Sequence, residues 1–96
     1  MYARVSTYTG PADRIDDAIR GFERSRELVT GMDGIVHAYM LVDRSSGKVM
    51  TISLWRDERA LQSSADRAAK VREEAAAAVG GTVESVESYE VALQVP

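Results

Sequence analysis

The sequence has 96 residues, of which 45% are hydrophobic and 28% charged, with a net charge of -3 at pH 7. This composition is typical of one globular domain spanning residues 1–96, and the charges are too evenly mixed for the basic surface that nucleic acid requires. The chain has no cysteine and one histidine, which excludes disulfides and thiolate metal sites, and we expect no cofactor.

No stretch of the sequence resembles a targeting or membrane segment. The first 20 residues carry several charges, among them Arg4, Asp13 and Asp17, and no apolar run approaches the length that crosses a bilayer. We therefore expect a cytoplasmic protein with no membrane partner.

The first predicted elements are a strand and a helix. Residues 2–8 are rich in β-branched and aromatic side chains, which favours a strand. Pro11 suits the first turn of a helix, and Gly31 suits its end. Between them, the apolar residues at helical spacing form one stripe, so this helix must lie on another layer. The stripe comprises Ile15, Ala18, Ile19, Phe22 and Val29.

Residues 34–55 predict a β-hairpin with a turn at 44–47. In that register Asp43 faces Lys48 as an ion pair, and Met40 faces Thr51. One face then holds Val36, Ala38, Met40, Val42, Val49, Thr51, Ser53 and Trp55; the other holds His37, Tyr39, Leu41, Met50, Ile52 and Leu54. A slip of one residue in the turn would exchange these partners.

The last third of the sequence predicts two helices and a strand. Asp57 is suited to cap a short helix that ends near residues 63–64, and Ser64 or Asp66 to cap the next one. That second helix is alanine-rich and stops at residues 80–81. The strand predicted at 82–95 is unusually long, so we expect a bulge near 85–88 or a strand that leaves its sheet partway.

The order of elements is βαββαβ, which predicts an α+β, ferredoxin-like fold with helices on one face of an antiparallel sheet. The other face would carry Tyr39, Leu41, Ile52 and further apolar side chains, which is too apolar to remain in water. We expect a second copy to cover it, so that two sheets close face to face in a homodimer and the long terminal strand reaches across.

Two stretches carry a resemblance to a known family. Residues 31–35 (GMDGI) and 54–61 (LWRDERAL) resemble segments of the antibiotic biosynthesis monooxygenase family of dimeric α/β barrels. Members often have Pro-Gly-Phe before the second strand, which is Asp33-Gly34-Ile35 here, and a tryptophan followed by an acidic, helix-starting segment. The resemblance implies the fold and the dimer, whereas fold alone does not fix the chemistry.

The resemblance also implies functional residues. Trp55 matches the tryptophan of quinone-forming oxygenases that use neither metal nor flavin. Their asparagine four residues earlier is Thr51 here, and their tyrosine six residues later is Leu61. Haem-degrading members carry a histidine ligand in the last helix, where residues 71–75 have none, so haem degradation by that mechanism is not expected.

Trp55, Thr51 and His37 are the candidate catalytic residues. Trp55 is either a core anchor or the wall of a cavity in which its N–H orients a ligand. Thr51 adds a hydroxyl on the same face. Its hydrogen-bond partner is either a ligand or a backbone group. His37 is either a general base or an interface side chain on the opposite face. The candidate substrate-binding residues are Ser53, Met40, Ala38, Phe22 and Leu61.

The first strand places Arg4, Ser6 and Tyr8 on one face. If Arg4 points inward it needs an acidic partner or an anionic ligand. We expect it instead to extend its guanidinium to the edge of the sheet.

Two functional hypotheses follow. The first is a cofactor-independent monooxygenase acting on a small aromatic or polycyclic phenol or hydroquinone, whose anion itself reduces oxygen. The second is a homodimer of the same fold that binds a small ligand, or serves a structural role, without catalysis. The absent asparagine and tyrosine favour the second hypothesis slightly.

Overall fold

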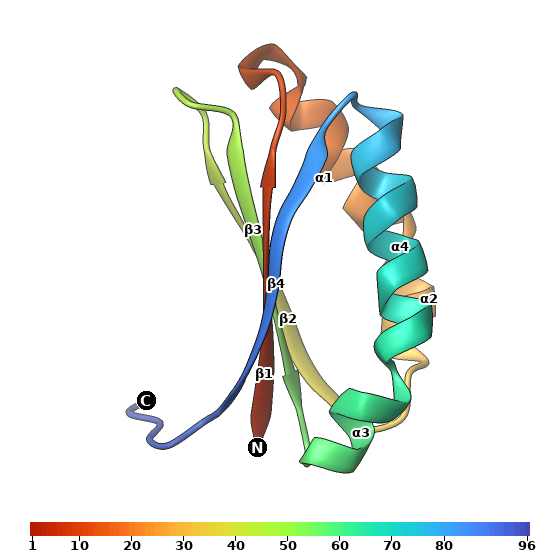
Figure 1. The fold of residues 1–96 in the computed structure, drawn as a ribbon, viewed down its shortest axis with the longest axis vertical. Helices are drawn as coiled ribbons and strands as arrows, with labels where there is room; N and C mark the ends of the chain where they lie inside the picture. The colour runs from red at the N-terminus through yellow and green to blue at the C-terminus, as the bar shows by residue number, and fades with distance from the viewer.

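The computed structural model describes residues 1–96, which form an antiparallel sheet with helices on one face (Figure 1). The strand order is β2-β3-β1-β4. The elements are β1 (Tyr2–Thr9), a 3-10 turn (Ala12–Arg14), α1 (Ile15–Arg24), α2 (Arg26–Thr30), β2 (Ile35–Asp43), β3 (Lys48–Trp55), α3 (Glu58–Ser63), α4 (Ala65–Ala78) and β4 (Thr82–Glu90). The ferredoxin-like α+β fold predicted from the sequence is therefore confirmed.

The hairpin has the predicted register over most of its length. Asp43 pairs with Lys48, Met40 with Thr51, and the match continues to His37 opposite Leu54. The register then shifts, so that Ile35 rather than Val36 stands opposite Trp55. The prediction for Val36 was wrong because a bulge puts Ile35 in its place opposite Trp55 and leaves Val36 exposed.

The predicted ion pair between Asp43 and Lys48 is absent. The Asp43 carboxylate instead accepts hydrogen bonds from the backbone N–H and the hydroxyl of Ser45, at 3.1 and 2.7 Å. These bonds lower the pKa of Asp43. Gly47 completes the turn with φ of 81°, and a Cβ there would overlap the Gly10 carbonyl oxygen. Local turn geometry therefore takes precedence over the cross-strand charge pair.

The first helix is broken where the sequence predicted one continuous helix. Residues 12–14 form a 3-10 turn, and α1 ends at Arg24 before α2 begins at Arg26. Ser25 lies at the break, where its hydroxyl donates to the Phe22 carbonyl at 2.8 Å. A serine that bonds its own preceding turn competes with regular helix hydrogen bonding, and hydrophobic spacing alone does not reveal this.

The helix starts after β3 agree with the sequence in position, but only the first of them has the predicted cap. Asp57 caps α3 by accepting from the Ala60 N–H at 2.8 Å, as predicted. That bond lowers the pKa of Asp57. Ser64 precedes α4 without capping it, because its hydroxyl donates to the Leu61 carbonyl at 2.8 Å. Ser64 is therefore free to accept a bond from the sheet.

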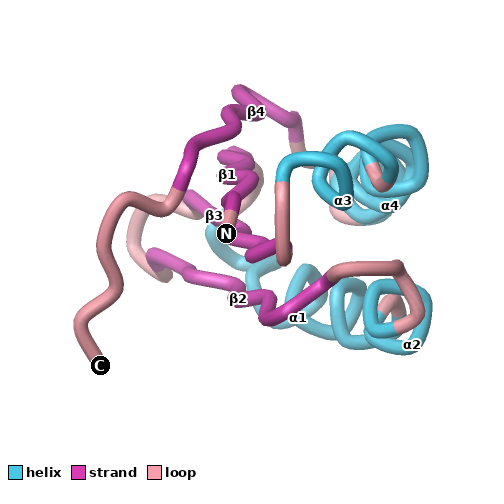
Figure 2. Tube along the Cα trace, turned by 90° about the horizontal axis from the view of Figure 1, so that it is seen from below, coloured by secondary structure: helices cyan, strands magenta, loops and turns pink.

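β4 is shorter than the strand predicted at 82–95. Its pairing with β1 skips Glu84, a bulge just before the predicted range, and the strand ends at Glu90. The Val91 N–H still donates to the Met1 carbonyl at 2.9 Å. The following residues leave the sheet on the side away from the helices (Figure 2). The prediction that the strand leaves its sheet partway is thus confirmed.

The core between sheet and helices consists of two separate apolar clusters. The upper cluster is built on Tyr8, Ile15, Val49 and Ala76, and the lower one on Met32, Trp55, Ala60 and Leu61. Between them, β1 and β3 present polar side chains. This interruption of the core positions the candidate site.

The face of the sheet away from the helices is open in the single chain. Tyr39 and Leu41 are about half exposed, at 53% and 49%, and Tyr89 is exposed to a similar degree. Val5, Met50, Ile52 and Leu54 lie between them on the same face, which we call the outer face. None of the helices is long and apolar enough to cross a membrane.

Candidate site between the sheet and the helices

The candidate site is a band of polar groups between the two apolar clusters, which we call the polar layer. It exists because β1 and β3 pair so that Arg4 faces Ser53 and Ser6 faces Thr51, with all four side chains toward the helices. The layer comprises Arg4, Ser6, the Tyr8 hydroxyl, Thr51, Ser53 and Ser64. The Trp55 ring bounds it below and the Tyr8 ring bounds it above.

Arg4 is the most unusual member of the layer, because only 5% of it is exposed. Its guanidinium donates to the Leu61 carbonyl at 2.7 Å and to the Ser64 hydroxyl at 3.2 Å, and it lies 5.4 Å from the centre of the Trp55 ring. Burial lowers the pKa of Arg4. The expectation that Arg4 reaches the sheet edge was wrong, since β1 is flanked by β3 and β4 and no edge is near.

Trp55 and Thr51, the two candidate residues on the helix side, both have internal partners. The Trp55 indole N–H donates to the Ser53 hydroxyl at 2.9 Å, and Trp55 is only 1% exposed. The Thr51 and Tyr8 hydroxyls are hydrogen-bonded at 3.0 Å. Burial raises the pKa of Tyr8, so its phenol stays protonated at neutral pH. A ligand that enters would exchange these bonds for its own.

The candidate substrate-binding residues are distributed around the layer. Phe22 packs edge-on against the Tyr8 ring, with ring centres 5.6 Å apart, and Met40 joins the same upper cluster. Leu61 is buried below and offers its carbonyl to Arg4. Ala38 lies opposite Ser53 on the edge strand β2 and is exposed. The structure thus brings Phe22, Met40 and Leu61 to the borders of the layer and leaves Ala38 at its rim.

His37 is separated from the other catalytic candidates. It pairs with Leu54 on the outer face, where its ring lies 6.1 Å from that of Tyr39. Trp55 and Thr51 lie on the opposite face of the same sheet. The structure therefore places no histidine in the polar layer, and His37 is in position for the interface role that the sequence left open.

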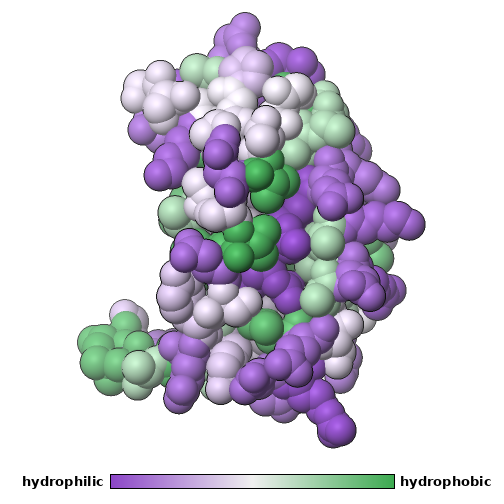
Figure 3. Space-filling view, viewed as in Figure 1, coloured by the Kyte–Doolittle hydropathy of each residue, from purple (hydrophilic) through white to green (hydrophobic).

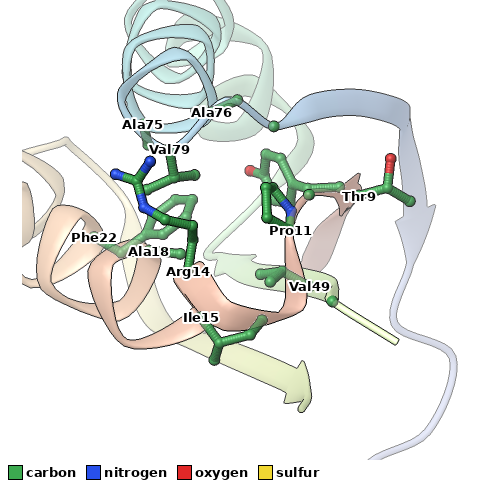
Figure 4. Close-up of a pocket in the computed structure, with 14 residues that line it drawn as sticks. Thr9, Pro11, Arg14, Ile15, Ala18, Phe22, Val49, Ala75, Ala76 and Val79 are labelled. Carbon is green, nitrogen blue, oxygen red and sulfur yellow. The ribbon is translucent and has the colours of Figure 1, made fainter. Parts of the chain in front are cut away.

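Two hollows lie beside the polar layer. The first, of about 30 Å³, lies beside the upper cluster and is lined by apolar side chains such as Ile15, Phe22, Val49 and Val79 (Figure 4). Ligand sites usually measure about 300–1,000 Å³, so it is too small for an aromatic ligand. The second is a groove of about 360 Å³ between the first helices and α4, lined by Leu28, Val71 and Glu74 among others. Neither involves Trp55 or Thr51.

Comparison with solved structures places the fold among the antibiotic biosynthesis monooxygenase-type proteins. A Deinococcus radiodurans protein classed as such a monooxygenase matches with a TM-score of 0.77 and 15% identity, covering 100% of this chain and 97% of that one. The haem degrader MhuD of Mycobacterium tuberculosis matches at 0.78 and 19%, covering 100% of both. SnoaB of Streptomyces nogalater, a cofactor-independent oxygenase, matches at 0.73 and 17%, covering 99% and 96%. The resemblance stated from the sequence is confirmed for the fold.

In sequence, the chain is similar to two uncharacterized Mycobacterium tuberculosis proteins. It is 33% identical to Rv2557 over 96 residues and 32% identical to Rv2558 over 97 residues. These matches cover 96% and 97% of this chain but 41% and 39% of the relatives, so the chain spans about two fifths of their length. No family model matches the sequence.

Proposed function

We propose that the chain is a cytoplasmic homodimer that binds a small aromatic phenol or hydroquinone in the polar layer and oxygenates it without a cofactor. The observation that supports this most directly is the polar layer itself. A core held together only by packing gains nothing from a guanidinium between its apolar clusters, because burying a charge is unfavourable. A ring-shaped ligand would meet Trp55 and Tyr8 as apolar walls, and hydroxyls of Thr51 and Ser53 as partners for its oxygens.

The net reaction needs no further reactant. The phenol and O2 give a quinone and water: one oxygen atom becomes a ring carbonyl, and the other leaves as water. The hydrogens of the phenol O–H and of the ring C–H that is replaced become those of the water, and the ring supplies all four electrons. The protein has to bind the substrate, favour its anion and exclude water. Because Arg4 is buried and positively charged, it favours the anion.

The outer face supports the homodimer. Its centre is apolar, whereas the charged residues on this side, Asp43, Lys48 and Glu87, stand toward its margins. This pattern of an apolar centre and polar rim is typical of protein interfaces. The terminal residues extend on the same side and are mostly apolar, with Leu93 80% exposed (Figure 3). We therefore assign the outer face to a second copy of the chain.

The activity is tested by following quinone absorbance with 1,5-dihydroxynaphthalene in air. We expect a rate above buffer, and a loss of at least about tenfold, or about 1.4 kcal/mol of transition-state stabilisation, in Thr51→Val. Thr7→Val is the matched control, because Thr7 lies on the outer face of the neighbouring strand. No rate above buffer, or equal rates in all three proteins, would reject the oxygenase.

One observation favours the second hypothesis, a homodimer that binds a ligand or serves a structural role without catalysis. Every buried polar side-chain atom already has a hydrogen-bond partner, so the polar layer is complete without a ligand. The same experiment separates the two functions. Tight binding of the naphthalene without quinone formation is the result that would establish the non-catalytic alternative.

A further inference from the structure

The polar layer holds a positive charge that no acidic group neutralises. The chain forms six ion pairs, and Arg4 takes part in none of them. Its acceptors, the Leu61 carbonyl and the Ser64 hydroxyl, are uncharged. A buried charge whose hydrogen bonds all go to neutral groups lacks the partner that such charges normally have.

A second arginine faces the polar layer from α4. Arg72 is half-buried and shares the sheet-facing side of α4 with Ala68 and Ala76, four residues to either side. It also takes part in none of the ion pairs. Ser64, which accepts from Arg4, lies about two turns before Arg72 on this helix, and Ala76, which packs in the cluster of Tyr8, lies about one turn after it, so Arg72 faces β1 between Arg4 and Tyr8.

In Figure 3, strongly hydrophilic atoms fill the seam between β4 and α4, the edge at which the space between sheet and helices meets solvent. Because Arg72 is half-buried whereas only 5% of Arg4 is exposed, an anion approaching from solvent would meet Arg72 before Arg4. Two like charges held together repel each other, and an anion between them removes that repulsion.

We propose that Arg4 and Arg72 together bind the anionic group of an aromatic ligand, a carboxylate or phenolate, whose ring lies against Trp55. This inference rests on the proposed function, because it assigns the substrate class of the same site. A planar guanidinium presents paired N–H donors that match the two oxygens of a carboxylate. Ammonium and hydroxyl groups lack this paired arrangement. Arg4 already lies over the Trp55 ring, so an anion bound to its guanidinium would stand beside that ring.

The test compares two probes that differ only in charge, 1-hydroxy-2-naphthoate and its neutral amide, by isothermal titration calorimetry. We expect the wild-type protein to bind the acid at least tenfold more tightly than the amide. Arg72→Gln should remove that preference, because it should lower the affinity for the acid and leave the affinity for the amide unchanged. Arg67→Gln is the matched control, because it removes the same charge from an exposed, unpaired position on the same helix.

Each result decides the inference independently of the oxygenase. Equal binding of acid and amide, binding of neither, or an acid affinity that Arg67→Gln lowers as much as Arg72→Gln would overturn it. The first of these could still accompany quinone formation from a neutral phenol, which would leave the proposed activity standing. Conversely, charge-selective binding without turnover would support the two-arginine site and reject the oxygenase.

Discussion

Replacing Arg4 with methionine should abolish selective binding of an aromatic acid and leave the protein at least as stable as the wild type. Exchanging a buried charged group for an apolar one of similar size is often neutral or stabilising by about 1–4 kcal/mol. Here the exchange leaves no acceptor unsatisfied, because the Leu61 carbonyl still receives the Ser64 hydroxyl. The free energy of unfolding, measured in urea, and the affinity for 1-hydroxy-2-naphthoate are the two readouts.

The two readouts separate a binding role of Arg4 from a structural one. If Arg4 mainly joins β1 to the helices, its loss would lower the free energy of unfolding by about 1.5–3 kcal/mol, the usual contribution of a charged hydrogen bond. That result, with acid binding retained, would contradict the account. Arg4→Ala serves as a comparison, because it also removes the charge but leaves a cavity, which is destabilising for reasons of packing alone.

Replacing Leu41 with glutamate on the outer face should convert the proposed dimer to monomers. A two-fold interface would bury the new carboxylate in both copies, where it has no partner, and each unpaired buried charge costs several kcal/mol. We expect the dissociation constant to rise at least about 100-fold, about 2.7 kcal/mol, in sedimentation equilibrium.

Leu28→Glu is the matched control, because Leu28 is a similarly exposed leucine, at 45%, on α2 at the helix side. It should remain dimeric. A wild-type protein with the mass of one chain at micromolar concentration would contradict the outer-face interface. Equal dissociation of the two variants would show that added charge, rather than its position, weakens the assembly.

The sequence was sufficient for features that depend on periodicity and turn chemistry. The alternation along residues 35–43 and 48–55, with a polar turn between, correctly predicted the register from Asp43 back to His37 and the face that Thr51, Ser53 and Trp55 share. Asp57 was a recognisable cap for the same reason, since its carboxylate acts on the nearest turn of chain. The residues that make these contacts are close in sequence, so a local sequence pattern is enough to predict them.

Features that depend on the order of strands in the sheet were not visible in the same way. Arg4 was expected at an edge, but β1 lies inside the sheet, which leaves the side chain no route except toward the helices. The partnership of Arg4 with Ser64 joins residues 60 apart in sequence. The sequence had placed Arg4, Ser6 and Tyr8 on one face, and only the fold shows that this face meets Thr51 and Ser53 in a single layer.

The bulge opposite Trp55 had no recognisable sign in the sequence. It exchanges Val36 for Ile35 on the helix side and ends the regular pairing at His37. Valine, isoleucine and alanine fit either face of a strand, so nothing in this run marks the extra residue. The consequence for function is small, because Trp55 and Ser53 keep their face.

The most direct test of a ligand site in the polar layer is the indole N–H resonance of Trp55, which is unique because the chain has one tryptophan. On titration with 1-hydroxy-2-naphthoate, we expect this proton-nitrogen peak to shift, together with the backbone peaks of Ser6 and Thr51. Its hydrogen bond to Ser53 lies in the polar layer, where the ligand would bind. Shifts confined to outer-face residues such as His37 and Tyr39, with the Trp55 indole peak unmoved, would contradict a site between the sheet and the helices.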